Sequence, residues 1–214
     1  MRVSIIIIFF FVFTSGAQNL PAVDIVSESG FVVNDANSDL GIEGTVYLNE
    51  NWDRVAEVIT HDDKNYTVEA INYNVKLETF VVKSSEGKLL TLNKDRVKYI
   101  KYNSSIFEII NGKYFEQFSR GEVEIYKEYY LAIISGAIDP MTKDKLTNDK
   151  YDIKSRYYQK EGDDIMEFKP TKKNILNLFE KDKAGKVKTY IKKQNLSIRD
   201  ENDLKQILKY YSTL

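Results

Sequence analysis

The chain has 214 residues, of which 43% are hydrophobic and 29% charged, and its formal net charge is −1. This composition is typical of a globular protein, and the length allows one domain or two small ones with a sizeable core. The chain contains no cysteine and a single histidine, His61. Disulfides, thiolate metal sites and cysteine nucleophiles are therefore excluded, and little material is left for His-dependent triads or multi-His metal sites.

The first segment of the chain carries the features of an export signal. Arg2 gives a short positive region, residues 5–13 are all apolar, and a run of small residues ends at Ala17. This pattern predicts a signal peptide over residues 1–17, with cleavage between Ala17 and Gln18. A membrane-spanning helix would need about 20 apolar residues, and a buried strand would need turn residues on both sides. We therefore expect an exported, periplasmic or secreted protein with no transmembrane segment in the mature chain.

Short runs of β-branched and aromatic residues, separated by tight polar turns, fill the chain from residue 42 to residue 169. After a polar lead over 18–41, they predict an antiparallel β-domain over 42–169, a meander that forms a small barrel or a sandwich. Asn111-Gly112 is the strongest hairpin signal. Residues 131–150 are rich in turn residues and predict a loop or lobe. The expected strands are 44–50, 54–60, 66–73, 78–84, 89–92, 97–103, 106–110, 113–119, 122–130, 151–161 and 164–169.

After Pro170 the spacing of apolar residues changes from the period of a strand to that of a helix. Thr171 and Asp200 are expected to cap helices. Each predicted helix is amphipathic and too short to be stable alone, so we expect it to pack on its neighbours or on the sheet. The fold class is therefore α+β, with two to three short helices over residues 170–214. Their apolar residues are Ile175, Leu178, Phe179, Val187, Tyr190, Ile191, Leu204, Ile207, Leu208 and Tyr211.

Charged residues are distributed unevenly along the chain. Between residues 18 and 60 nearly every charge is acidic, whereas residues 169–193 hold nine lysines against Glu180 and Asp182. This asymmetry favours either of two interpretations: the Lys-rich helices contact an anionic protein or envelope component, or they are solvated helix faces. The predicted export argues against a nucleic-acid partner.

One stretch has the alternating oxygen ligands with which a calcium loop begins. Its later positions do not match, because Leu40 stands where a glycine is needed and Val46 stands where the bidentate glutamate belongs, so an Asn/Asp-rich turn explains the same residues. Four aspartates further along follow no ligand spacing. The calcium-like residues are Asp35, Asn37, Asp39, Gly41 and Glu43; the later aspartates are Asp139, Asp144, Asp149 and Asp152.

No catalytic motif is present in the sequence. His61 precedes two aspartates, but neighbours in a tight turn seldom face one another, so a hairpin turn is expected there. Asp and Glu are numerous, yet nothing singles out a pair of the glycosidase kind. Three tyrosine pairs could form a binding platform, although adjacent strand residues face opposite sides, which favours core packing for one ring of each strand pair. They are Tyr129-Tyr130, Tyr157-Tyr158 and Tyr210-Tyr211.

The order of these segments, together with several short motifs, resembles a group of small, uncharacterised exported proteins of Gram-negative bacteria. The resemblance covers most of the mature chain, with a β-rich body and a Lys-rich helical C-terminal tail. It implies a periplasmic or secreted bacterial location and brings no activity, cofactor or catalytic residue with it. The matching positions are Tyr73-Asn74, Glu78-Thr79-Phe80, Tyr190-Ile191-Lys192 and Tyr210-Tyr211.

The sequence therefore predicts an exported, non-enzymatic binding protein of the cell envelope or the secreted fraction. The alternative is an Asp/Glu-dependent hydrolase that acts on a glycan or a similar polymer, which would need a cleft with two carboxyl groups. No catalytic, cofactor-binding or metal-binding residue is assigned.

Overall fold

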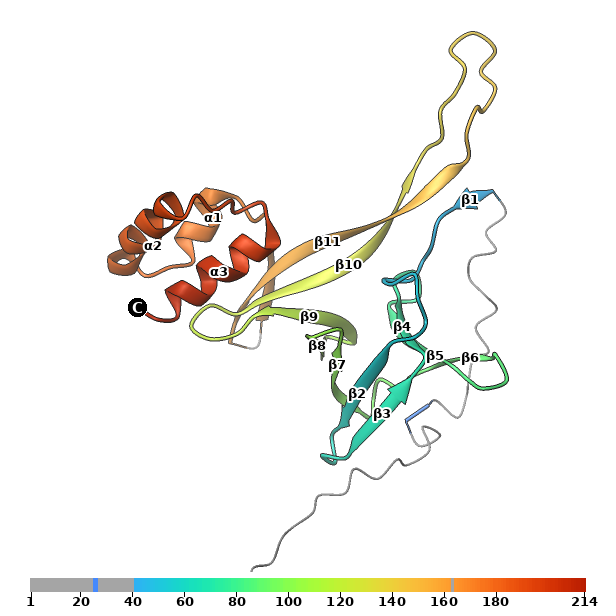
Figure 1. Cartoon of the computed structure of the whole chain (residues 1–214), viewed down its shortest axis with the longest axis horizontal. Coiled ribbons are helices and arrows are strands. Elements are labelled where there is room, and N and C mark those ends of the chain that lie inside the picture. The colour runs from blue at the N-terminus through green and yellow to red at the C-terminus, as the bar shows by residue number, and fades with distance from the viewer. Residues whose placement is uncertain (1–24, 27–40, 163) are drawn as a thin grey trace, which may run out of the picture.

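The computed structural model describes residues 25–26, 41–162 and 164–214. The predicted signal peptide and most of the polar lead lie outside the described residues. Strands make up a larger share of the described chain than helices, and the helices follow at its C-terminal end (Figure 1). The strands are β1 (Ile42–Glu43), β2 (Val55–Thr60), β3 (Asn65–Glu69), β4 (Ile71–Asn74), β5 (Thr79–Lys83), β6 (Leu89–Thr91), β7 (Val97–Tyr102), β8 (Ser105–Ile110), β9 (Lys113–Ser119), β10 (Ile125–Ile134), β11 (Asp149–Glu161) and β12 (Asp164–Phe168).

Two sheets carry this β-domain, and their strands pair antiparallel as predicted, apart from the short β1, which pairs parallel with β11. The meander is interrupted where β2 pairs with β7, because the intervening β4, β5 and β6 form the smaller sheet. The longer sheet runs in the order β1-β11-β10-β9-β8-β7-β2-β3, with β12 also paired to β11, and the smaller sheet is β4-β5-β6. Within the described chain the ends of the long sheet, β3 and β1, do not pair with each other. The long sheet is therefore an open sheet, and β3 and β1 are the strands at its two ends.

The first hydrophobic core lies between the small sheet and the half of the long sheet that contains β2, β3, β7 and β8. Phe80 on β5 is at its centre and is fully buried. Its ring meets those of Tyr102, Phe107 and Tyr114 edge-on, with centroids 5.1–5.4 Å apart. Edge-to-face aromatic contacts of this kind add to the free energy gained by burial.

Strands β10 and β11 form a long ribbon that leaves the body of the sheet and projects as an arm (Figure 1). Ten consecutive register pairs join them, from Ile125 opposite Gln159 to Ile134 opposite Lys150. The loop predicted over 131–150 is therefore wrong at both ends, because residues 131–134 continue β10 and residues 149–150 begin β11. The apolar residues LAII at the end of β10 extend the ladder beyond the point where turn residues suggested a break.

Two of the expected strands differ from the structure. Residues 44–50 form no regular strand; Tyr47 makes a single bridge with Asn74, supported by the backbone hydrogen bond from Val75 N to Val46 O at 2.8 Å. The expected strand 66–73 is broken at Ala70, whose φ is 50°. This left-handed backbone, unfavourable for alanine, turns the chain out of the long sheet and into the small one.

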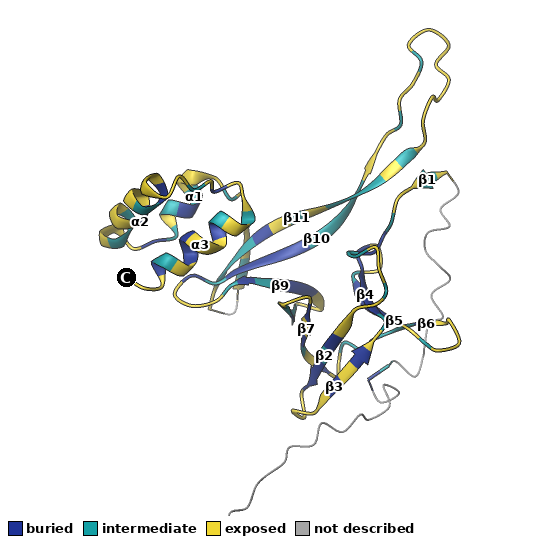
Figure 2. Ribbon diagram, in the orientation of Figure 1, coloured by how far each residue is buried: buried dark blue, intermediate teal, exposed yellow. Residues whose placement is uncertain are grey.

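Three helices follow in the described C-terminal part: α1 (Lys172–Asn177), α2 (Lys181–Lys193) and α3 (Glu201–Tyr211). Both predicted caps are confirmed, since the Thr171 side chain accepts from Asn174 N, and the Asp200 side chain accepts from Asn202 N and Asp203 N. The buried face of α3 is also the predicted one (Figure 2). No helix in the described part of the chain has the length and apolar character that a membrane crossing requires.

A second hydrophobic core joins these helices to the sheet. Val187, Ile191 and Ile207 pack there with residues of the long sheet, including Ile125 and Tyr157. The boundary at residues 169–170 therefore separates strands from helices, but it crosses a shared core. We call residues 170–214 the helical unit.

Replacing Phe80 by alanine tests the first core. The substitution empties the centre of the aromatic cluster, so we expect a loss of about 3–5 kcal/mol in the free energy of unfolding. Chemical denaturation followed by circular dichroism measures it. Met166→Ala, at a side chain 53% exposed, is the control and should change stability by less than about 0.5 kcal/mol. A similar small change for Phe80→Ala would contradict the assignment of this core.

Candidate binding site

A charged junction lies between the two cores, on the same face of the long sheet. Glu116 on β9 is paired in register with Lys127 on β10, and these side chains are only 4% and 7% exposed. Glu201, at the start of α3, reaches Lys127, with 2.7 Å between Lys127 Nζ and Glu201 Oε1. Lys205, one turn further along α3, lies 3.9 Å from Glu116. The four groups balance two positive charges against two negative ones.

Hydroxyl groups satisfy the remaining acceptors of this junction. Ser105 Oγ donates to Glu116 at 2.7 Å, and the Tyr129 hydroxyl donates to the other oxygen of the same carboxylate. The Tyr157 hydroxyl donates to Glu201 at 2.5 Å. Burial, and then the nearby Glu116 carboxylate, raises the pKa of Tyr129, which therefore stays protonated as a donor. Since buried charges are tolerated when they are paired and hydrogen-bonded, the junction is a docking contact for α3.

A hollow of about 450 Å³ opens on the helical unit. Three segments line it: the start of α1, the last part of α2, and the connection from α2 to α3. Ile191 and Ile198 are buried at its floor. The volume lies within the range of small-molecule pockets. Its lining residues are Pro170, Thr171, Lys172, Ile191, Leu196, Ser197, Ile198 and Arg199.

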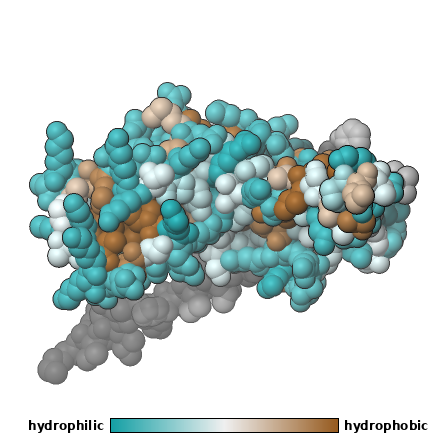
Figure 3. All heavy atoms as spheres, turned by 90° about the horizontal axis from the view of Figure 1, so that it is seen from above, coloured by the Kyte–Doolittle hydropathy of each residue, from teal (hydrophilic) through white to brown (hydrophobic). Residues whose placement is uncertain are grey.

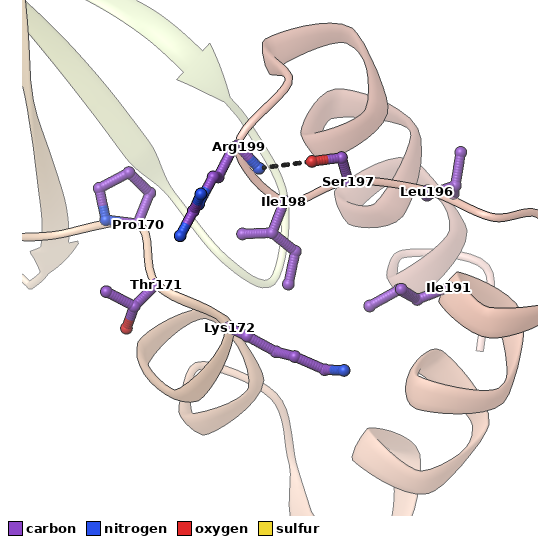
Figure 4. Close-up of a pocket in the computed structure, with 8 residues that line it drawn as sticks. All are labelled: Pro170, Thr171, Lys172, Ile191, Leu196, Ser197, Ile198 and Arg199. Atoms are coloured by element: carbon purple, nitrogen blue, oxygen red, sulfur yellow. Dashed lines mark hydrogen bonds between the residues drawn. The ribbon is translucent and has the colours of Figure 1, made fainter.

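Two cations stand at this hollow. Figure 4 shows the Lys172 amine reaching across toward Ile191, while the Arg199 guanidinium lies beside Pro170. No carboxylate lines the hollow, and within the described chain neither cation is in an ion pair. The nearby acids are already engaged by backbone, since Asp203 accepts from Ser197 N at 2.8 Å and Asp200 caps α3. The hollow therefore combines an apolar floor with two positive charges that have no carboxylate partner.

The surface around the hollow is rich in lysine. The helical unit holds eleven basic and five acidic side chains, a net charge of +6, so the rest of the chain carries −7 of the total of −1. Lys173, Lys192 and Lys193 are exposed on α1 and α2. Figure 3 shows apolar atoms gathered at the helical end of the molecule, with hydrophilic side chains around them. The lysines in the last turn of α2 also complement the negative end of its helix dipole.

The other residues considered from the sequence form no site of this kind. Asp35, Asn37 and Asp39 lie outside the described residues, and Glu43 contacts Lys150 and Asn148. The described residues contain no group of three or more His, Cys, Asp or Glu side chains that could hold a metal ion.

His61 lies in the exposed turn between β2 and β3. Its neighbour Asp62 accepts from the Thr60 hydroxyl at 2.5 Å and contacts Lys64 at 2.9 Å. The hydrogen bond from Thr60, and then that from Lys64, lowers the pKa of Asp62 to about 2. These contacts stabilise the turn at residues 61–64, and a hairpin turn is what the sequence predicts for this segment.

The two tyrosine pairs of the ribbon divide between the faces of the sheet, as alternation predicts. Tyr157 packs on Phe118 in the second core, whereas Tyr158 packs on Phe115 and donates to Glu128 at 2.6 Å on the other face. Burial, and then the hydrogen bond to Glu128, raises the pKa of Tyr158 to about 12.

On α3, Tyr211 is buried against Phe179, while Tyr210 stacks on Tyr190 with ring centroids 3.9 Å apart. Both rings therefore pack against other parts of the helical unit. Together with the pairs on the ribbon, they place the paired tyrosines in packing contacts, and no platform of rings is formed.

Buried carboxylates are each engaged by basic and hydroxyl groups. Glu128 contacts Lys113 and Tyr158, and Glu116 belongs to the junction. A second hollow of about 480 Å³ contains Glu108, and a third of about 300 Å³ contains Glu43. Each of the three hollows thus holds at most one carboxylate, and the two-carboxylate cleft that a hydrolase would need is not formed in any of them.

Three comparisons with known proteins were made. The chain matches no protein-family model, no curated protein and no solved structure.

Sequence reasoning singled out the Lys-rich helices but missed both the hollow and the junction. The hollow joins residues 170–172 to residues 191–199, and no local pattern shows that these segments meet. The junction joins Lys127 to Glu201, which are 74 residues apart.

The junction makes stability depend on pH. Burial favours protonation of Glu201, but the hydrogen bonds from Lys127 and Tyr157 outweigh it and hold the pKa below the ordinary value of 4.5. Ionised Glu201 therefore stabilises the fold above that value, and the stabilisation is lost as the pH falls through the lowered folded-state pKa. Glu201→Gln also leaves Lys127 buried without its partner. We expect a loss of about 1–3 kcal/mol at neutral pH, which shrinks in acid.

Urea unfolding at neutral pH and at about pH 3, a value below the ordinary pKa of glutamate, checks this expectation. The control is Glu167→Gln, at an exposed side chain on β12, which should behave as wild type at both pH values. Equal stability of Glu201→Gln and wild type at neutral pH would show that the junction does not hold α3 in place.

Proposed function

We propose that this chain is an exported, non-enzymatic binding protein of the cell envelope or secreted fraction, and that the hollow of its helical unit binds an acidic segment of a partner protein. One observation carries the proposal: the hollow has an apolar floor, two cations without ion pairs in the described chain, and no carboxylate of its own. The export rests on the signal peptide predicted from the sequence.

The electrostatic character of the unit supports an acidic partner. Its charge of +6 contrasts with the acidic remainder of the chain, so an acidic segment is attracted to this end of the molecule and repelled elsewhere. Such a field raises the association rate and orients the encounter. The apolar floor adds specificity, because an apolar side chain next to a carboxylate fits the hollow better than a simple anion does.

The geometry suits a protein segment in particular. Lys172 and Arg199 line the same hollow as Ile191 and Ile198. A partner can therefore make a charged contact and an apolar contact close together. A planar guanidinium pairs well with a carboxylate in two-point contact, while a lysine amine acts as a point charge. An acidic residue followed by a large apolar residue presents the matching arrangement.

Carbodiimide crosslinking tests the proposal, because this reagent joins lysine amines directly to carboxylates in contact. The purified protein is incubated with the envelope fraction of the producing cell, and the conjugated peptides are identified. We expect conjugates attached at lysines of the helical unit. They should weaken in about 1 M salt, where the screening length falls to about 3 Å.

Paired variants make this experiment specific. Lys172→Gln with Arg199→Gln should abolish the conjugates, while Lys83→Gln with Lys88→Gln removes the same charge from β5 and the following turn and should preserve them. Equal conjugation by wild type and both double variants would overturn the proposal. So would the absence of peptide conjugates, which is the result expected if the ligand were a lipid or a nucleic acid.

A further inference from the structure

Strand β10 has an open edge over much of its length. It pairs with β9 only at Ile125, Tyr126 and Lys127, whereas its pairing with β11 continues to Ile134. No other strand of the described chain pairs with residues 128–134 on the side away from β11. Backbone N–H and C=O groups at alternate positions of this edge therefore point away from the ladder, where another strand can bind them.

Beyond Glu128, the open edge lacks the residues that normally protect an edge strand. The sequence YYLAII over residues 129–134 has no charge, no proline and no glycine. Its partner in the ribbon is different, because β11 carries Lys154 opposite Tyr130 and Asp152 opposite Ala132. Natural edge strands are usually protected by lysine, proline or inward charges. The uncharged composition belongs instead to a strand that is paired on both sides.

Exposed apolar side chains accompany the open edge. Ile133 and Ile134 are 56% and 52% exposed, and because neighbours alternate they lie on opposite faces of the ribbon. Further out on the arm, Ile138, Met141 and Leu146 are exposed as well. Exposed apolar side chains gathered on one projecting element favour an interaction surface there.

Residues 25–26 and 41–43, the first described parts of the chain, contact other strands. Val26 bridges Leu92 next to β6, and Ile42 pairs with Asp149 on the opposite side of the ribbon, along β11. Neither contact lies at the open edge of β10. A second copy of the chain, in contrast, presents a strand of the same uncharged composition.

We propose that β10 pairs with β10 of a second copy, in antiparallel register about a two-fold axis at Ala132. This register places Tyr130 opposite Ile134, Leu131 opposite Ile133, and the small Ala132 opposite itself. Every pair is uncharged, and the aromatic Tyr130 faces the β-branched Ile134, which is a favourable cross-strand pair. The two long sheets become one continuous sheet through the interface, a self-complementary contact of the kind two-fold dimers use. This surface is separate from the hollow.

Disulfide trapping tests the register directly, because the chain has no native cysteine. Directly opposite residues of an antiparallel pair have Cα atoms about 4.5–5.5 Å apart, within the range of a disulfide. Ala132→Cys should therefore give a covalent dimer on mild oxidation. Met141→Cys, on the exposed arm and away from the pairing register, is the control and should remain monomeric under the same conditions.

Sedimentation velocity over a range of protein concentrations tests the dimer without crosslinking. We expect Ala132→Lys to raise the dimer dissociation constant at least about tenfold, because two like charges are then directly opposite. Ile138→Lys introduces the same charge outside the register and should leave the constant unchanged. A mixture of Ile134→Lys and Tyr130→Glu should form a heterodimer more readily than either variant forms a homodimer.

Each outcome decides for or against the interface. A wild-type protein that sediments as a monomer at all concentrations would overturn it, and this is also the result if another part of the chain covers the edge. A dimer unaffected by Ala132→Lys, or equal trapping of Ala132→Cys and Met141→Cys, would overturn it too. Circular dichroism of every variant checks that the fold is retained. Substitutions at Ile134 and Ile138 are expected to preserve it because these side chains are exposed.

Discussion

The contact between Lys127 and Glu201 is the constraint on which the placement of the helical unit depends. Apolar packing in the second core is not directional and would allow the helices to slide on the sheet. A buried amine held by a carboxylate permits far less movement, because displacement would leave the amine without its partner at a cost of about 1–3 kcal/mol. Together with Glu116 and Lys205, this contact fixes α3 against β9 and β10. The position of α3 in turn determines where the α2–α3 connection meets α1.

Local signals were sufficient for much of the fold. The Asn111-Gly112 hairpin, both helix caps and the buried face of α3 could be predicted because each depends on residues close in sequence. The break at Ala70 could not, since alanine gives no local sign of a left-handed backbone. The end of β10 was missed for a related reason. Its residues carry a strand signal, but the turn-rich residues that follow obscure it, and only pairing with β11 settles its length.

The candidate site was only partly accessible from the sequence. Lysine enrichment after residue 169 is visible in composition, so an anionic partner could be considered at once. The hollow depends on three segments that meet in space, and which lysines remain unpaired depends on contacts such as that of Lys183 with Glu122, 61 residues away. The amino-acid composition does not show whether a lysine amine is held in such an ion pair or faces the hollow. The distinction between a solvated face and a binding surface is therefore a property of tertiary structure.

The protein separates its two unusual surfaces. The hollow is at the helical end, and the uncharged strand edge lies along the ribbon toward the arm (Figure 1). The proposed acidic segment and the proposed second copy would therefore contact separate parts of the molecule. The charges differ as well, since the helical unit carries a net charge of +6 and residues 129–134 carry none. The two proposed contacts therefore rest on different physical interactions.

The unbroken ladder between β10 and β11 also has a mechanical consequence. Hydrogen bonds of an antiparallel pair lie perpendicular to the strands. Because β10 and β11 are joined through residues 135–148 of the arm, a pull along the ribbon between the arm and the second core is carried by both strand backbones in parallel and places little load on these bonds. Unzipping would need a pull across the strands, which breaks the pairs one at a time. The ribbon is therefore expected to resist a pull along its own axis more strongly than a pull across its strands.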